Sequence, residues 1–192
     1  MSIRKNELEL FPTPISLYDL SDLDLDSIVD CVEGIDKEEF HLLDNGKTDY
    51  QIGDNLLDNP DLVQLKEHIE YCIEDYSRKL GFVEIKLSGS WSSITDIGGR
   101  LELHRHEMSM VSGVFYPKVD CEISPLLFKN PIWQYKMAEC YDFSIQSKYA
   151  SFYDFIKPHS GLLILFPSWL EHKTDKEIGR RIIISFNAEI DK

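Results

Sequence analysis

The sequence has little positive charge for its length. Its 192 residues include 20 Lys and Arg against 34 Asp and Glu, which gives a formal net charge of −14. Proteins that bind nucleic acid neutralise its phosphates with clustered Lys and Arg. We therefore do not expect nucleic acid as a partner of this chain.

Long apolar runs and closely spaced cysteines are also lacking. No stretch of the sequence approaches the roughly 18 apolar residues that a membrane span needs, and the first residues lack the apolar core of a secretory signal. The cysteines stand at positions 31, 72, 121 and 140, with no C-x-x-C pair among them. Such cysteines are mostly reduced. We therefore expect a cytoplasmic protein that has no disulfide and no membrane segment.

The chain has the length of a single domain, 1–192, with two parts of different character. We interpret residues 1–84 as a helical N-terminal support region. A short apolar-periodic helix is expected after the Ser and Asp caps of 19–30. A longer helix should follow Asn59, which can cap it, and should end at Gly81.

Residues 85–192 favour strands instead, because short β-rich runs alternate with Gly, Pro and Asp. Strands following a helical segment are typical of a sandwich or barrel with helices packed outside, which is an all-β core with flanking helices (α+β). The expected strands are Ile85–Thr95, Arg100–His106, Met110–Tyr116, Leu126–Phe128, Gly161–Phe166 and Arg180–Ile190.

An aromatic-rich insertion at residues 129–159 interrupts this pattern. A stretch this long without clear elements is usually a functional lid or a binding loop. An ordinary hydrophobic covering of the barrel is an equally good interpretation.

Three histidines form the most informative pattern. His104 and His106 alternate with Leu101 and Leu103, so in an extended segment both imidazoles point away from the leucines, to one face. His172 follows an apolar strand far downstream and could complete a metal site on that face. Neutral imidazole suits iron, copper, zinc and nickel, so the residues alone do not choose the metal. Each histidine taken singly could instead be an ordinary hydrogen-bonded or turn residue.

Arg181 opens a very apolar strand, where an arginine has little reason to be buried unless it meets an anion. Arg matches a carboxylate bidentately, which Lys cannot do. Ser185 lies four residues on, on the same strand face, so its hydroxyl could share that anion. The alternative is a surface arginine, as we expect for Arg180.

This ordered set resembles the iron(II)/2-oxoglutarate-dependent oxygenases, in a branch related to prolyl hydroxylases. The resemblance is strongest over 91–187 and weak over the N-terminal part. The matching segments are Phe11-Pro-Thr-Pro-Ile15, Trp91, the stretch from His104 to Tyr116, the stretch from Gly161 to His172, and Arg181-Ile-Ile-Ile-Ser-Phe-Asn187.

The resemblance implies a double-stranded β-helix, a cupin-like jelly-roll with the site at one open mouth. It makes His104 and His172 ligands of Fe(II), and it makes Arg181 the partner of the 5-carboxylate of 2-oxoglutarate, assisted by Tyr116 and Ser185. It further implies an oxygenase that uses O2 to hydroxylate a substrate C–H bond, with release of succinate and CO2. The relation to prolyl hydroxylases suggests a peptide substrate, and a small molecule remains the alternative.

The sequence departs from the widespread H-x-D or H-x-E motif, because His106 stands at the third position. His106 can itself be the third ligand, Glu107 can replace it, or the site can have only two firm ligands. We favour His106.

Two other functions are compatible with the same residues. One is a cupin-like dioxygenase or isomerase that binds its metal with three histidines and uses no 2-oxoglutarate. The other is a non-enzymatic binding module on the jelly-roll scaffold.

Overall fold

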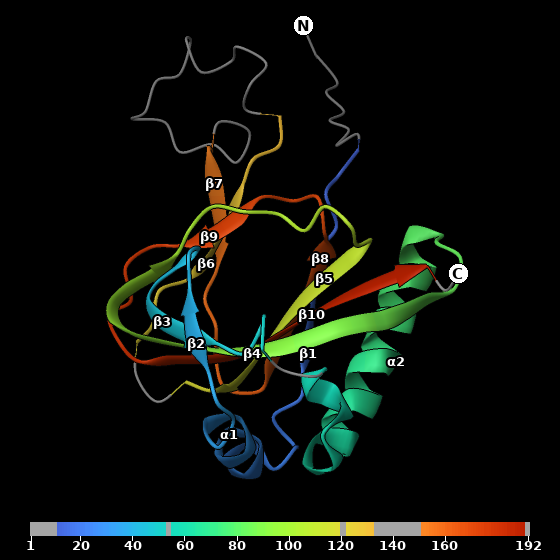
Figure 1. The fold of residues 1–192 in the computed structure, drawn as a ribbon. Coiled ribbons are helices and arrows are strands. Elements are labelled where there is room, and N and C mark those ends of the chain that lie inside the picture. Colours follow the sequence, from blue (N-terminus) through green and yellow to red (C-terminus); the bar gives the residue numbers. More distant parts are fainter. Residues whose placement is uncertain (1–10, 53–54, 120–121, 133–150, 191–192) are drawn as a thin grey trace, which may run out of the picture.

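The computed structural model describes residues 11–52, 55–119, 122–132 and 151–190 (Figure 1). The elements are β1 (Ser16–Asp19), α1 (Leu25–Glu33), β2 (Glu38–Phe40), β3 (Leu43–Thr48), α2 (Val63–Leu80), β4 (Ile85–Leu101), β5 (Val111–Lys118), β6 (Leu126–Lys129), β7 (Tyr153–Ile156), β8 (Leu162–Pro167), β9 (His172–Thr174) and β10 (Arg181–Ile190). Two short 3₁₀ helices, Leu56–Asp58 and Pro60–Leu62, precede α2.

The strands form two antiparallel sheets. The larger has the order β1-β8-β5-β10-β4-β3-β2, and the smaller has the order β7-β6-β9. Both helices lie on the outer side of the larger sheet (Figure 1). The predicted β core with helices packed outside is therefore present.

Strand β10 separates two apolar clusters by simple alternation. Its even-numbered side chains from Ile182 to Ala188 are buried in a cluster shared with α1 and α2. Ile183 points the other way, into a second cluster between the sheets. Because successive side chains of a strand face opposite sides, Arg181 and Ser185 lie on the same inner face as Ile183. The strand thus brings polar groups to the interior without breaking the helix-side core.

The N-terminal part is less helical than the sequence suggests. Helix α1 forms where predicted. Asn59 caps the 3₁₀ helix Pro60–Leu62 and not α2, which begins at Val63 and ends, as predicted, at Gly81, in the left-handed conformation with φ 70°. However, β1, β2 and β3 also lie within residues 1–84 and pair with the larger sheet. These strands are short, and β3 (LDNGKT) is polar. Such strands are stabilised by distant partners rather than by their own periodicity.

The two strands expected over 85–106 are one strand, β4, which ends at Leu101. Gly98 and Gly99 fall between the two expected strands, but they lie inside β4, opposite an irregularity in its pairing with β3. Gly98 has φ 86°, and a Cβ on Gly99 would lie 2.4 Å from the Asp44 carbonyl oxygen. Glycine therefore marks a bulge here and not a turn.

Some predictions fall partly beyond the described residues. Of the aromatic-rich insertion, 133–150 lie outside them, so its interpretation as a lid stays a prediction. Cys31 and Cys72 are free thiols, whereas Cys121 and Cys140 are not among the described residues. No helix in the described part of the chain combines the length and the apolar character that crossing a membrane requires.

Candidate active site

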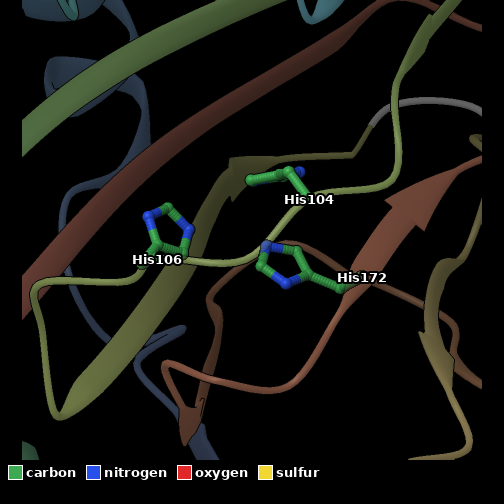
Figure 2. Close-up of side chains that lie close together, drawn as sticks. All are labelled: His104, His106 and His172. Carbon is green, nitrogen blue, oxygen red and sulfur yellow. The ribbon is translucent and has the colours of Figure 1, made fainter.

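Three histidine side chains converge on one point between the sheets (Figure 2). His104, His106 and His172 each offer a ring nitrogen, and these nitrogens lie within 4.8 Å of one another. The ring centroids are 4.2 Å apart for His104 and His172 and 5.1 Å apart for His104 and His106. The sequence predicted this grouping, and the structure brings all three members together.

Backbone hydrogen bonds hold these positions. His104 and His172 donate to each other's carbonyl oxygens, at 3.1 and 2.9 Å, in an isolated antiparallel bridge. The His106 amide donates to the Ser168 carbonyl oxygen at 3.0 Å. His104 and His106 stand beyond the end of β4, so the strand predicted to carry them stops short of both. Their two-residue spacing in extended chain still directs both rings to one side.

Two of the rings are oriented by their own main chain. His104 Nδ1 lies 2.9 Å from the Glu102 carbonyl oxygen, and His172 Nδ1 lies 2.9 Å from the Leu170 carbonyl oxygen. A carbonyl can only accept, so each Nδ1 must carry the proton. The lone pair of each ring is then on Nε2, which is the arrangement common in metal-binding histidines.

Burial keeps the three imidazoles uncharged. Desolvation lowers the pKa of His104 against a small opposing effect of the Glu102 carbonyl. Desolvation, followed by repulsion from His104, lowers the pKa of His106 to about 4. The same two causes hold the pKa of His172 well below its ordinary value. Neutral imidazole is the form that binds metal.

The structure does not bring the alternative ligand Glu107 into this group. Glu107 is exposed and accepts a 2.8 Å hydrogen bond from Arg105 in a surface ion pair. Among the described residues, the group of potential metal-binding side chains consists of the three histidines.

Arg181 is buried, as predicted, with an exposed fraction of 3%. Its Nη2 donates to the Tyr116 hydroxyl at 2.9 Å, and its Nη1 donates to Glu177 Oε1 at 2.5 Å. Burial acts to lower the pKa of Arg181, but Tyr116 and Glu177 outweigh it and raise the pKa. Nε of Arg181 has no hydrogen-bond partner although it is buried.

Glu177 was not predicted from the sequence. Its side chain is fully buried, and its second carboxylate oxygen accepts from the Ser124 amide at 2.8 Å. The bulge in β4 fixes its backbone, because the Gly98 amide donates to the Glu177 carbonyl and the Glu177 amide donates to the Gly99 carbonyl, both at 2.7 Å. The i,i+4 spacing to Arg181 is a weak signal outside a helix, so this pairing depends on the tertiary fold.

A cavity of about 150 Å³ joins the histidines to Arg181. Its walls combine apolar and hydroxyl side chains, and the structure places both Ser185 and Tyr116 among them. Its full lining also contains Phe40, Leu42, Leu43, Thr48, Tyr50, Trp91, Ser93, Thr95, Leu101, Arg105, Gly113, Val114, Leu126, Phe166 and Ile183.

The chemistry of this lining fits a divalent metal and a dicarboxylic acid. Three uncharged imidazoles can bind the metal at one end. At the other end, the buried Arg181 Nε is a donor without an acceptor, and a carboxylate oxygen would supply one. Tyr116 and Ser185 add hydroxyls to the lining, and the Tyr116 hydroxyl accepts from Arg181.

Asn187 is a second residue that the sequence analysis did not assign. It lies on the inner face of β10, six residues after Arg181, and its Nδ2 is 3.4 Å from His106 Nδ1. The alternation that placed Ser185 beside Arg181 also predicts Asn187 on that face, so this signal was present in the sequence.

The family comparison agrees with this geometry. Residues 89–187, more than half of the chain, match the family described as "Putative 2OG-Fe(II) oxygenase". No curated protein matches the chain.

Solved structures of several oxygenases share the fold. HygX from Streptomyces hygroscopicus, solved with nickel, 2-oxoglutarate and hygromycin B, is 12% identical over 92% of this chain and 83% of its own, with a TM-score of 0.66. A Pseudomonas putida prolyl-4-hydroxylase is 12% identical over 93% and 94%, with a TM-score of 0.60. A Trichoplax adhaerens prolyl hydroxylase, in complex with a hypoxia inducible factor peptide fragment, is 13% identical over 91% and 83%, with a TM-score of 0.61.

These likenesses confirm the predicted double-stranded β-helix. The family match covers both ends of the cavity, from the strand that carries Trp91 to Asn187. The chain therefore belongs to the 2OG-Fe(II) oxygenase family, and it is an enzyme that uses Fe(II), 2-oxoglutarate and O2.

Proposed function

We propose that this enzyme hydroxylates a C–H bond of a peptide or a small molecule and releases succinate and CO2. His104, His106 and His172 are the metal ligands in this proposal. Arg181, with Tyr116 and Ser185, binds the carboxylate of 2-oxoglutarate that lies away from the metal. Iron(II) with 2-oxoglutarate supplies the oxidising power, because O2 is spent on converting the keto acid to succinate while one oxygen atom enters the substrate.

The observation that carries the proposal is the unpartnered Nε of Arg181. A buried arginine with a free donor is costly unless an anion completes its hydrogen bonds. This guanidinium lines the same cavity as the three histidines. A dicarboxylic acid has one carboxylate for the metal held by the histidines and a second for Arg181.

The charges of the cavity support a dianion. The pKa shifts keep the three imidazoles neutral, so they leave both charges of a divalent metal uncompensated. Arg181 and Glu177 cancel each other. The metal-loaded cavity then has a net charge of +2, which the two carboxylates of 2-oxoglutarate reduce to zero. Such compensation matters most in a buried site, where an unbalanced charge is poorly solvated.

Apolar side chains in the cavity wall limit the access of water to the site. Val114, Leu126 and Phe166 are buried and line the cavity next to the polar residues. They exclude water from the point where the substrate C–H bond must react, and this protects the reaction from side products.

The test is to add 2-oxoglutarate to the iron-loaded protein without oxygen and to record the visible spectrum. We expect a weak charge-transfer band, and succinate release once oxygen and a substrate are admitted. Absence of both the band and succinate would contradict the proposal.

The three-histidine set also keeps a cupin-like enzyme without 2-oxoglutarate as a second candidate. Arg181→Ala separates the two candidates. In an oxygenase it should lower 2-oxoglutarate affinity at least about 30-fold. In a cupin-like enzyme, which does not use 2-oxoglutarate, the substitution should have little effect on activity. Arg180→Ala is the matched control, since Arg180 is exposed and pairs with Glu33. Should Arg181→Ala not fold, Arg181→Lys keeps the charge, loses the bidentate geometry and should still weaken binding.

Three further expectations stay predictions. HygX was solved with hygromycin B bound and the Trichoplax adhaerens prolyl hydroxylase with a peptide fragment, so both a small molecule and a peptide remain in the proposal. A cytoplasmic location and a single domain over 1–192 rest on the sequence alone.

A further inference from the structure

His106 differs from the other two histidines in what holds its ring. His104 and His172 each have a backbone carbonyl within 2.9 Å of Nδ1. His106 Nδ1 faces a side chain instead, the amide of Asn187 at 3.4 Å. An amide has both a donor and an acceptor end, so it can stabilise either tautomer of the ring.

The amide orientation that the structure contains is the one that opposes metal binding through Nε2. Asn187 Nδ2 is a donor, so His106 Nδ1 must accept and the ring proton must be on Nε2. With Nδ1 facing Asn187, Nε2 is the nitrogen left for a metal, and a protonated Nε2 has no lone pair to offer. Metal binding through Nε2 therefore requires His106 to move its proton to Nδ1.

The surroundings of Asn187 permit that change. Ser112 Oγ donates to Asn187 Oδ1 at 2.8 Å, so its single proton is used and Ser168 Oγ, 2.8 Å from Ser112 Oγ, donates to it. Both serines are almost completely buried, with exposed fractions of 1% and 0%. When the amide turns over, Nδ2 donates to Ser112, Ser112 donates to Ser168, and Oδ1 accepts from His106 Nδ1. The same pairs of heavy atoms stay hydrogen-bonded, the Ser168 proton turns away from Ser112, and the two amide ends have nearly the same shape.

We propose that Asn187 is a positioning residue that selects the metal-binding tautomer of His106 by reversing its amide, with Ser112 and Ser168 reversing their hydroxyls behind it. The inference rests on the proposed role of His106 as a ligand. In the structure Asn187 donates to His106, and with a metal bound it accepts from His106.

Nickel affinity measured by calorimetry tests the role of the side chain. Outer partners of metal-bound histidines typically contribute 10- to 100-fold to affinity, and we expect a loss in that range for Asn187→Ala. Asn187→Asp should bind within a few-fold of the wild type or more tightly, because a carboxylate can only accept from Nδ1. The matched control is Asn130→Ala, which removes an amide bonded to the Ser151 carbonyl elsewhere in the fold and should change nothing.

Ring-nitrogen NMR shifts of the metal-free and zinc-bound proteins test the tautomer directly. We expect His106 to be protonated at Nε2 in the metal-free wild type, and at Nδ1 in the zinc-bound wild type and in metal-free Asn187→Asp. Identical His106 tautomers in the metal-free wild type and Asn187→Asp would overturn the proposal, as would equal nickel affinity of the wild type and Asn187→Ala.

The two possible failures are distinguishable. A wild type that binds no nickel overturns the ligand set and, with it, the role of Asn187. A wild type that binds nickel as tightly as Asn187→Ala leaves the ligand set standing and removes Asn187 from it. If Asn187→Ala does not fold, Ser112→Ala removes the hydroxyl that follows the amide and should give a smaller loss of nickel affinity; an unchanged affinity contradicts the proposal.

Discussion

Glu177 gives Arg181 a counter-charge inside the protein. Both side chains are buried, and removing one partner of such a pair leaves the other charge uncompensated in a poorly polar site. Glu177 therefore compensates the charge of Arg181 without a ligand, but it leaves the hydrogen bonds of that arginine incomplete. Its free Nε still allows a ligand carboxylate to add to the pair.

Glu177→Gln should lower the free energy of unfolding by about 3–5 kcal/mol, which corresponds to a fall in melting temperature of about 10 °C for a chain of this size. Because the variant leaves the charge of Arg181 unpaired, 2-oxoglutarate should raise its melting temperature more than that of the wild type. Thermal unfolding with and without 2-oxoglutarate measures both effects.

Glu74→Gln is the control for this variant. Glu74 forms an ion pair with Arg78 at the same four-residue spacing, but both side chains are about 70% exposed. Exposed pairs contribute at most about 0.5 kcal/mol when they lie on a helix. Equal melting temperatures for the two variants would show that the buried ion pair contributes no more to stability than the exposed one.

At the scale of elements, a glycine in β5 leaves room for a large side chain of β10 on the side of the sheet that packs against the helices. Gly113 lies in the middle of β5, opposite Phe186 of β10. A Cβ on Gly113 would lie 2.2 Å from the Phe186 ring and 2.7 Å from a Leu165 methyl. Phe186 is wholly buried in the helix-side cluster, so it cannot move away without opening that cluster.

Gly113→Ala should therefore cost about 1–3 kcal/mol of stability through overpacking, as measured by urea unfolding. Gly89→Ala is its match, because Gly89 is also in a strand of the same sheet and a Cβ there would meet nothing within 4 Å. We expect no loss for Gly89→Ala. Similar midpoints for both variants would contradict the packing argument.

At the scale of the whole molecule, the buried histidines link stability to pH. The unfolded chain protonates its histidines near pH 6.5, whereas burial lowers their pKa values in the folded state. Below pH 6.5 the unfolded state therefore binds more protons than the folded state. The metal-free protein should lose stability as the pH falls from 6.5 towards 4, and this contribution should be absent above pH 7.

For His106 alone, a folded pKa of about 4 gives a loss of about 3 kcal/mol at pH 4. His106→Gln should remove this part of the pH dependence, whereas His68→Gln, at an exposed position of α2, should not. The measurement is the free energy of unfolding from urea titrations of metal-free protein between pH 4 and 8. If the free energy of unfolding changed with pH in the same way for the wild type and His106→Gln, a contribution of His106 would be excluded.

Local patterns predicted the helices, the long apolar strands and the convergence of the histidines with Arg181. Alternation alone correctly placed Ser185 on the inner face of β10. What escaped prediction depends on partners distant in sequence. The polar β3 is held by β4, and Glu177 is held by the bulge at Gly98. Neither has a period or a motif of its own.

The bridge between His104 and His172 has a consequence for how this site can change. Main-chain atoms set the separation of these two positions, and the His106 amide is likewise held by a main-chain carbonyl. Replacing one of these histidines by a residue with a carboxylate should therefore alter the charge of the proposed metal site without displacing the other two side chains. The side chains determine which atoms the site offers, whereas main-chain hydrogen bonds determine where those side chains lie. The chemistry of such a site can therefore change by one substitution at a time.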